Sequence, residues 1–319
     1  MDNFYKSLIM SIGETELTKS TNVERLKKKM KLCLPLLDSM LHSTNLISTF
    51  SQTTETLYVS NASVLRNYLT SFTEDLESEF GCITLDGRIV VATEKFWQLQ
   101  TIETSLLSFV VYNQRNVTAS DTPIYLPNGS PVVPHRLITV TLVDRIQIAI
   151  VCGPEPSLHE IQNNYISHYW SPLVSYLREC SRSLLRSFPP ELKLDQNVFS
   201  VILLNVADGQ SLFTFHAHGN STAADAEGMS QASARKHALM EFYLSSSEFY
   251  QNNNSDGEEG DGTGGSEVKE TYQCFTTHKC YALKTSSYEI YVLFSSVVPT
   301  YSMSYLTKAT LKLLTRDRT

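Results

Sequence analysis

The chain has 319 residues, which is enough for two domains of about 100–200 residues each. Hydrophobic residues make up 42% and charged residues 18%, as in an ordinary soluble globular protein. The net charge of −7 argues against a general nucleic-acid binder, which usually presents a basic face. No apolar run approaches the ~20 residues needed to span a bilayer. Glu14 and Glu16 interrupt any signal-peptide core.

The cysteines are scattered and form no CxxC pair, so they predict neither a disulfide framework nor a redox motif. Several stand within apolar strand-like runs, where a thiol behaves as a small hydrophobic side chain. This pattern indicates a reduced, cytosolic protein. The six cysteines are Cys33, Cys82, Cys152, Cys180, Cys274 and Cys280.

The first clear element is an amphipathic helix over residues 22–41. Thr21 and Glu24 have the spacing of a capping box at its start, and Pro35 is expected to kink or split it. A lone helix of this length is marginal in water, so it must pack on something. Its apolar residues, at helical spacing, are Val23, Leu26, Met30, Leu34, Leu37 and Leu41, with lysines around the polar side.

Residues 49–56 are polar and are interpreted as a link, and 57–76 are weakly helical. A hairpin is predicted next, because Asp86-Gly87 separates two apolar runs. These strands cover 81–85 and 88–93. A helix over 95–112 follows, with one apolar face made of Leu99, Ile102, Leu106 and Phe109.

Residues 123–136 read PIYLPNGSPVVPHR and are predicted to form a rigid turn. Four prolines fix φ there and favour extended predecessors, and Asn128-Gly129 tolerates positive φ. Two strands, 137–143 and 146–152, should then pair around Asp144-Arg145. A long helix over 158–185 closes this part of the chain.

Phe188-Pro189-Pro190 marks a boundary, after which the same order of elements repeats. The order β-β-α-β-β-β-α therefore occurs twice, with an Asp-Gly hairpin at the same place each time. It predicts an α+β protein with antiparallel sheets flanked by helices. The repeat consists of strands 198–205 and 211–215, helix 233–250, strands 272–275, 279–283 and 289–295, and helix 302–314.

Residues 251–267 contain no apolar side chain and are predicted to be a disordered acidic loop. Asp256, Glu258 and Glu267 fall at positions one, three and twelve of a calcium loop. However, Asp261 occupies the position that needs glycine, and no helix follows. A solvated loop is therefore the preferred interpretation.

No catalytic, cofactor-binding or metal-binding residue is predicted. His216 and His218 on one strand, and Cys274, His278 and Cys280 on two others, have zinc-ligand chemistry, but their spacings fit no known zinc module. They are interpreted as edge polar groups and core thiols.

Two further groups of residues receive a structural interpretation. His135-Arg136 is expected to cap the proline-rich turn. Phe96, Trp97, Tyr169 and Trp170 belong to the core or to a partner surface, with the core favoured.

Four segments resemble the longin-domain family of the Fuzzy, Mon and Hermansky–Pudlak proteins. They are residues 22–41, GRIVVATEKFWQL at 87–99, YLPNGSPVVPHRL at 125–137 and CGPEPSL at 152–158. The resemblance implies tandem longin (profilin-like) domains. Residues 1–48 would be the closing helix of a first longin domain, 57–187 the second and 191–319 the third. The rest of the first domain is expected to be missing, as in a fragment, a short isoform or an incomplete gene model.

The long turn favours the Fuzzy branch of the family. That branch implies a non-enzymatic subunit of the ciliogenesis and planar polarity effector complex. Inturned-like and Fritz-like subunits and a Rab-family GTPase would be its partners, and it would be at most part of a nucleotide-exchange complex. In this class the first longin domains contact the GTPase, so this chain is not expected to support exchange. Its location would be the cytoplasm, cytoskeleton and cilium base, with peripheral membrane recruitment through the complex. The alternative is an endosomal trafficking adaptor of the Mon or Hermansky–Pudlak type.

Overall fold

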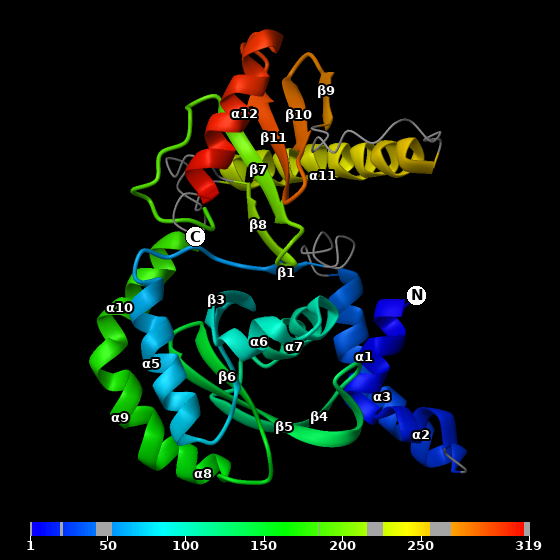
Figure 1. The fold of residues 1–319 in the computed structure, drawn as a ribbon, viewed down its shortest axis with the longest axis vertical. Helices are drawn as coiled ribbons and strands as arrows, with labels where there is room; N and C mark the ends of the chain where they lie inside the picture. The colour runs from blue at the N-terminus through cyan, green and yellow to red at the C-terminus, as the bar shows by residue number, and fades with distance from the viewer. Residues whose placement is uncertain are drawn as a thin grey trace, which may run out of the picture. The chain divides into compact units, whose positions relative to one another are not determined.

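The computed structural model describes residues 2–19, 22–42, 53–184, 186–215, 226–255 and 269–315 (Figure 1). The chain divides into two compact units, Met1–Leu184 and Leu185–Thr319. Each unit is built on an antiparallel sheet with helices on both faces, so the predicted α+β class is confirmed. Among the described residues, no helix combines the length and the apolar character that a membrane crossing needs.

The sheet of the first unit has five strands in the order β3-β2-β6-β5-β4. Because successive side chains of a strand point to opposite faces, it serves two cores. Ile83 and Ile148 belong to one core, and Cys82 and Ala149 belong to the other. The strands are β2 (Phe80–Leu85), β3 (Arg88–Ala92), β4 (Ala119–Leu126), β5 (Ser130–Val143) and β6 (Ile146–Cys152).

The predicted Asp-Gly hairpin joins β2 and β3. Asp86 has φ 52° and Gly87 has φ 75°, the left-handed conformations that such a tight turn requires. A Cβ at Gly87 would also lie 2.6 Å from the Cβ of Tyr112. Both the positive φ and this close contact therefore require glycine at this position.

One face of this sheet is covered by α5 (Ala62–Asp75) and by a helical run that begins at α8 (Leu158–Glu160) (Figure 1). Phe72 meets the rings of Tyr169 and Trp170 edge-on, with centroids 5.4 and 5.5 Å away. The predicted single helix over 158–185 is instead broken into turns of different pitch, and Pro172, which lacks an N–H, lies in one of them. The run comprises Ile161–Ile166, α9 (Ser167–Trp170), Ser171–Leu173, α10 (Val174–Cys180) and Ser181–Ser183.

The other face carries α6 (Glu94–Gln98) and α7 (Thr101–Asn113), where a single helix was predicted. Beside α7, at the β4 edge of the sheet, lies a further layer made of α1 (Asp2–Ile12), α2 (Glu14–Lys19) and α3 (Val23–His42) (Figure 1). Met10, Leu36 and Met40 from this layer share one core with Phe96 and Leu106. Pro35 was expected to kink or split α3. The helix is not split, because it runs unbroken from Val23 to His42, and the kink stays a prediction.

The predicted rigid turn at 123–136 is also wrong in extent. Most of it forms β4 and β5, and only residues 127–129 lie between the two strands. Pro131 and Pro134 lie in β5 between the last two registered pairs, Ile124 opposite His135 and Leu126 opposite Ser130, and neither proline is itself paired. A proline there costs no ladder hydrogen bond, so the strand tolerates it.

The segment before α5 is not the polar link that was expected. Residues 53–56 are buried, and Thr54–Glu55 forms the short strand β1. The hydroxyls of Thr54 and Thr104 are 2.6 Å apart, and Thr56 forms a parallel bridge with Ile89 of β3. Residues 43–52 lie outside the described residues.

Within the second unit the strands follow the order β8-β7-β11-β10-β9. Tyr291 on β11 packs against Phe242 and Tyr243 of α11. Tyr281 on β10 faces the opposite side, where its hydroxyl bonds to Glu270 beside α12. The elements are β7 (Val198–Asn205), β8 (Gln210–Thr214), α11 (Ala226–Ser255), β9 (Lys269–Cys274), β10 (His278–Lys284), β11 (Tyr288–Ser295) and α12 (Thr300–Thr315).

Helix α11 is longer than predicted and continues five residues into the segment expected to be a loop. The rest of that segment, 256–267, lies outside the described residues.

Candidate interaction site at the N-terminal helices

A buried carboxylate holds the turn between β4 and β5. Glu103 on α7 is 1% exposed, and its Oε1 accepts the backbone N–H groups of Asn128 and Gly129 at 2.8 and 2.9 Å. Its Oε2 accepts the N–H of Gln100 at 3.2 Å and caps the helix. Sequence reasoning missed Glu103. The available signal was the Asn-Gly pair, whose two amides need an acceptor.

Arg136 occupies a second structural junction. Its guanidinium forms a fork with Asp121, at 2.5 Å from Nη2 to Oδ2 and 3.2 Å from Nε to Oδ1. Its Nη1 also donates to the carbonyls of Pro154 and Pro156 at 2.6 and 3.0 Å. The hydrogen bond with Asp121 raises the pKa of Arg136. These contacts join β4, β5 and the loop after β6, whereas Arg136 was expected to cap the proline-rich turn.

The predicted candidates for zinc chemistry do not converge where they are described. Cys274 is exposed on β9, whereas Cys280 is buried and desolvation raises its pKa to about 12. His278 stacks on Phe275 with ring centroids 4.7 Å apart. Among the described residues, no three His, Cys, Asp or Glu side chains gather as metal ligands would. His216, His218 and the calcium-loop residues Asp256, Glu258, Asp261 and Glu267 lie outside that part of the chain.

The four aromatic residues in question belong largely to the core of the first unit. Phe96 and Trp170 are each 2% exposed, and Trp97 and Tyr169 are half-buried against them or their neighbours. The hydrogen bond from Tyr169 to Asp75 raises the pKa of this tyrosine to about 12.

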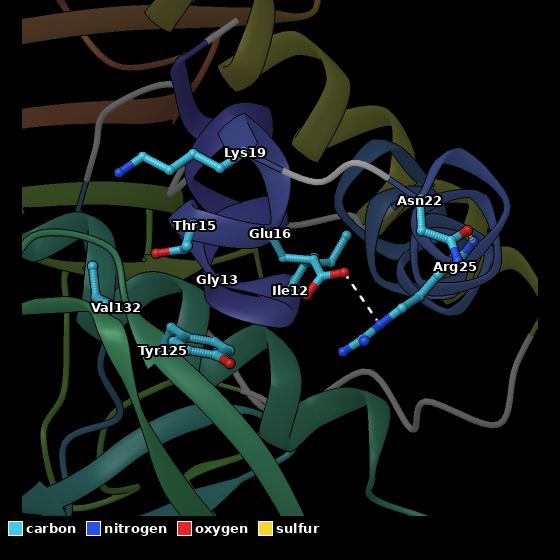
Figure 2. Close-up of a pocket in the computed structure, with 9 residues that line it drawn as sticks. All are labelled: Ile12, Gly13, Thr15, Glu16, Lys19, Asn22, Arg25, Tyr125 and Val132. Carbon is cyan, nitrogen blue, oxygen red and sulfur yellow. Dashed lines mark hydrogen bonds and ion pairs between the residues drawn. The ribbon is translucent and has the colours of Figure 1, made fainter.

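A hollow of about 300 Å³ lies where the N-terminal layer meets β4 and β5 (Figure 2). Gly13, with φ 89°, forms the junction between α1 and α2. A Cβ at this position would lie 2.8 Å from the ring of Tyr125, so a larger residue would push the two helices off the sheet. Val132 forms the opposite wall (Figure 2).

Ion pairs join α2 to α3 across this hollow. Glu16 meets Arg25 at 3.3 Å and Lys29 at 3.2 Å, and Lys19 stands at the rim (Figure 2). Asn22 accepts the N–H of Arg25 at 3.0 Å and so caps α3. Thr21, the predicted cap, lies outside the described residues. The residues that line the hollow include one carboxylate, Glu16, and two cations, Lys19 and Arg25, so its lining is net basic.

A second hollow of about 490 Å³ shares Ile12 and Tyr125 with the first. Its wall is mainly apolar and includes Met10, Leu36 and Ile124. Cys33 also lines it, and burial raises the pKa of this thiol. A raised pKa disfavours the reactive thiolate, so the second hollow suits non-covalent contacts better than covalent chemistry.

Comparison with known proteins places these features in a family. Residues 76–169 match the model of the second longin domain of FUZ, MON1 and HPS1, and residues 197–318 match the model of the third. A "Protein fuzzy homolog" from Xenopus tropicalis is 33% identical over 327 residues, which cover 99% of this chain and 78% of that protein. The chain belongs to the Fuzzy family of longin-domain proteins. The family resemblance inferred from the four sequence segments is thus confirmed.

Other relatives are matched over less of their length. The human "Protein fuzzy homolog" is 33% identical over 239 residues, which cover 75% of this chain and 56% of that protein. Among solved structures, Myxococcus xanthus MglB matches at 10% identity with a TM-score of 0.30, covering 39% of this chain and 95% of MglB.

Proposed function

We propose that this chain is a non-enzymatic scaffold subunit of the ciliogenesis and planar polarity effector complex, paired with an Inturned-like subunit and assembled with a Fritz-like one. The observation that carries the proposal is the 33% identity to the frog Fuzzy homologue, which extends over 99% of this chain. That alignment spans the N-terminal layer and both units together, so the relative shares their combination.

The buried charges support a scaffold role. Glu103 is used by three backbone amides, and Arg136 by one carboxylate and backbone carbonyls. A catalytic group needs a free position facing substrate. The hydrogen-bonding groups of these two side chains instead hold loops in place.

An exposed aromatic surface on the second unit supports partner binding. Tyr301 and Tyr305 stand one turn apart on α12 and are 85% and 75% exposed. Val297, just before the helix, is 75% exposed. Tyrosine is enriched at the centres of protein interfaces. We assign this surface, Val297, Tyr301 and Tyr305, to the Inturned-like subunit.

The pair would be linked to the regulation of a Rab-family GTPase in vesicle-mediated transport and cilium assembly, at the cilium base. We expect the chain to leave nucleotide release from a Rab at its intrinsic rate, both alone and with its partner. Fluorescent-nucleotide release measures this. Acceleration by the pair would place an exchange surface within the two units. It would contradict the expectation that the first longin domains contact the GTPase.

Co-purification tests the pairing. The chain is co-expressed with an Inturned relative and, separately, with a Ccz-like subunit. We expect Inturned to be retained and the double variant Tyr301→Ala, Tyr305→Ala to lose about tenfold in affinity, or about 1.4 kcal/mol. Tyr68→Ala and Tyr176→Ala, which remove exposed tyrosines of the first unit, are the matched controls. Retention of the Ccz-like subunit instead would favour an endosomal adaptor of the Mon or Hermansky–Pudlak type.

A further inference from the structure

Helix α3 has a wider apolar face than its neighbours cover. Cys33, Leu36 and Met40 are buried beneath it, where α3 meets α1 and α7. Three other apolar side chains point to solvent, namely Val23, Met30 and Leu34, which are 60%, 40% and 51% exposed. We call these three residues the α3 stripe.

The stripe is one continuous line on the helix. Its members are spaced at i, i+7 and i+11, and at about 100° per residue they fall within about 40° of one another. The first and last are separated by eleven residues of helix, or about 16 Å along the axis. Leu26 and Leu37 are half-buried between the stripe and the buried face. The stripe therefore has the length and shape of half of a helix–helix contact.

Basic side chains border the stripe. Lys27 and Lys31 are exposed and follow it on the solvent side, with Lys28 beyond them. Lys27 pairs with Glu24 at 3.1 Å, but an ion pair this exposed contributes little and is easily exchanged. Val23–His42 carries five basic against two acidic side chains, in a chain whose net charge is −7. The border is thus a local positive patch on an acidic protein.

We propose that the α3 stripe binds an amphipathic helix of a partner protein whose apolar ridge is bordered by aspartate and glutamate. Packing ridge against stripe would remove three exposed apolar side chains from water. The partner's carboxylates would meet Lys27 and Lys31. This inference goes beyond the proposed function, because it assigns a surface of the N-terminal layer and does not use the exposed tyrosines of α12.

A membrane surface fits the observations less well. A helix that lies in a bilayer interface needs a broad free apolar face. In α3 most of that face is already packed within the first unit, and only the narrow stripe is free. A ridge of three residues matches a protein helix better than a lipid layer.

The experiment uses the whole chain and two labelled, designed helical peptides of about five turns each. Both carry the same leucine ridge, which one borders with glutamate and the other with lysine. We expect fluorescence anisotropy to show saturable binding of the glutamate peptide, about tenfold tighter than the lysine peptide. Leu34→Asp and Met30→Asp should each weaken it about tenfold. Lys27→Glu with Lys31→Glu should reverse the preference.

The controls separate this surface from general adhesion. Val206→Asp introduces the same charge at an exposed valine of the second unit and should leave peptide binding unchanged. Equal binding of the two peptides, or insensitivity to Leu34→Asp, overturns the proposal. The proposal is also overturned if neither peptide binds but the chain sediments with phosphatidylcholine–phosphatidylserine vesicles and this sedimentation requires Leu34. Inturned retention is measured on the same Leu34→Asp variant, so loss of peptide binding alone leaves the proposed pairing intact.

Discussion

Two helices that follow equivalent hairpins, α7 in the first unit and α11 in the second, have opposite surroundings. Seven consecutive or near-consecutive positions of α7, including Glu103, Thr104 and Leu106, are buried. In α11, Leu239 and Phe242 are buried while Glu241 and Leu244 between and after them are exposed. The difference is that α1, α3 and β1 all pack on α7. One order of elements therefore yields an inner helix in one unit and a surface helix in the other.

This difference dictates where polar groups are tolerated. Inside the first unit each must find a partner, and Glu103 finds the amides of the β4–β5 turn. On the second unit the helices face water, so tyrosines and lysines can stay unburied and serve as contact residues. Removing the N-terminal layer should expose α7 to water, as α11 is exposed in the second unit.

The largest expected effect tests whether that layer is integral to the first unit. Met40→Ala removes a side chain that is 2% exposed in the shared core and should lower the free energy of unfolding by about 2–5 kcal/mol. Leu34→Ala, on the same helix but 51% exposed, should change it by less than about 0.5 kcal/mol. Urea unfolding measures both. Equal effects would mean that α3 is only loosely attached.

A smaller effect is expected at the carboxylate beneath the turn. Glu103→Gln keeps the shape of the side chain but replaces one acceptor oxygen by an N–H₂ group that faces a backbone donor. Losing a charge-assisted bond of this kind should cost about 1–3 kcal/mol. Glu94→Gln, in the exposed first turn of α6, is the matched control. Unchanged stability of the Glu103 variant would show that this carboxylate does not hold the β4–β5 turn.

The sequence allowed the periodic elements to be predicted, because their signals are local. The strands at 146–152 and 198–205 were predicted with the ends that the structure has. Both are apolar runs bounded by turn residues. The Asp86-Gly87 hairpin was predicted from two residues whose conformational preference decides the turn.

Features that depend on distant contacts could not be predicted in the same way. Glu103 reaches a turn 25 residues away, and no local pattern indicates that pairing. Prolines 131 and 134 suggested a turn, but they lie in a strand at positions where the ladder needs no N–H from them. The amphipathic pattern of α3 required a packing partner without indicating that α7 would supply it.

A sub-kilocalorie effect is expected at the edge of the second unit. Hydrogen bonds from Lys308 and then Tyr281 lower the pKa of Glu270. A carboxyl whose folded pKa is depressed contributes stability above its unfolded pKa of about 4.3, and that stability is lost as pH falls through the folded pKa. The side chain is 34% exposed, so the contribution should stay below about 1 kcal/mol. Glu270→Gln and Lys308→Met should flatten the same acidic limb of unfolding stability against pH. Different pH dependences for the two variants would show that the Glu270–Lys308 contact does not cause this stability.

The smallest effect concerns reactivity and leaves stability unchanged. Cys274 is exposed on β9, whereas Cys82 and Cys280 are buried and desolvation raises the pKa of each to about 12. Since the thiolate is the reactive form, a thiol reagent near neutral pH should modify Cys274 first, and the two buried thiols only when their units open. Peptide mapping by mass spectrometry over time gives the order. Cys274→Ser should abolish the fast phase. Fast modification of Cys82 would show that the inner layer of the first unit opens as readily as the edge of the second, and the contrast between the two units would then fail.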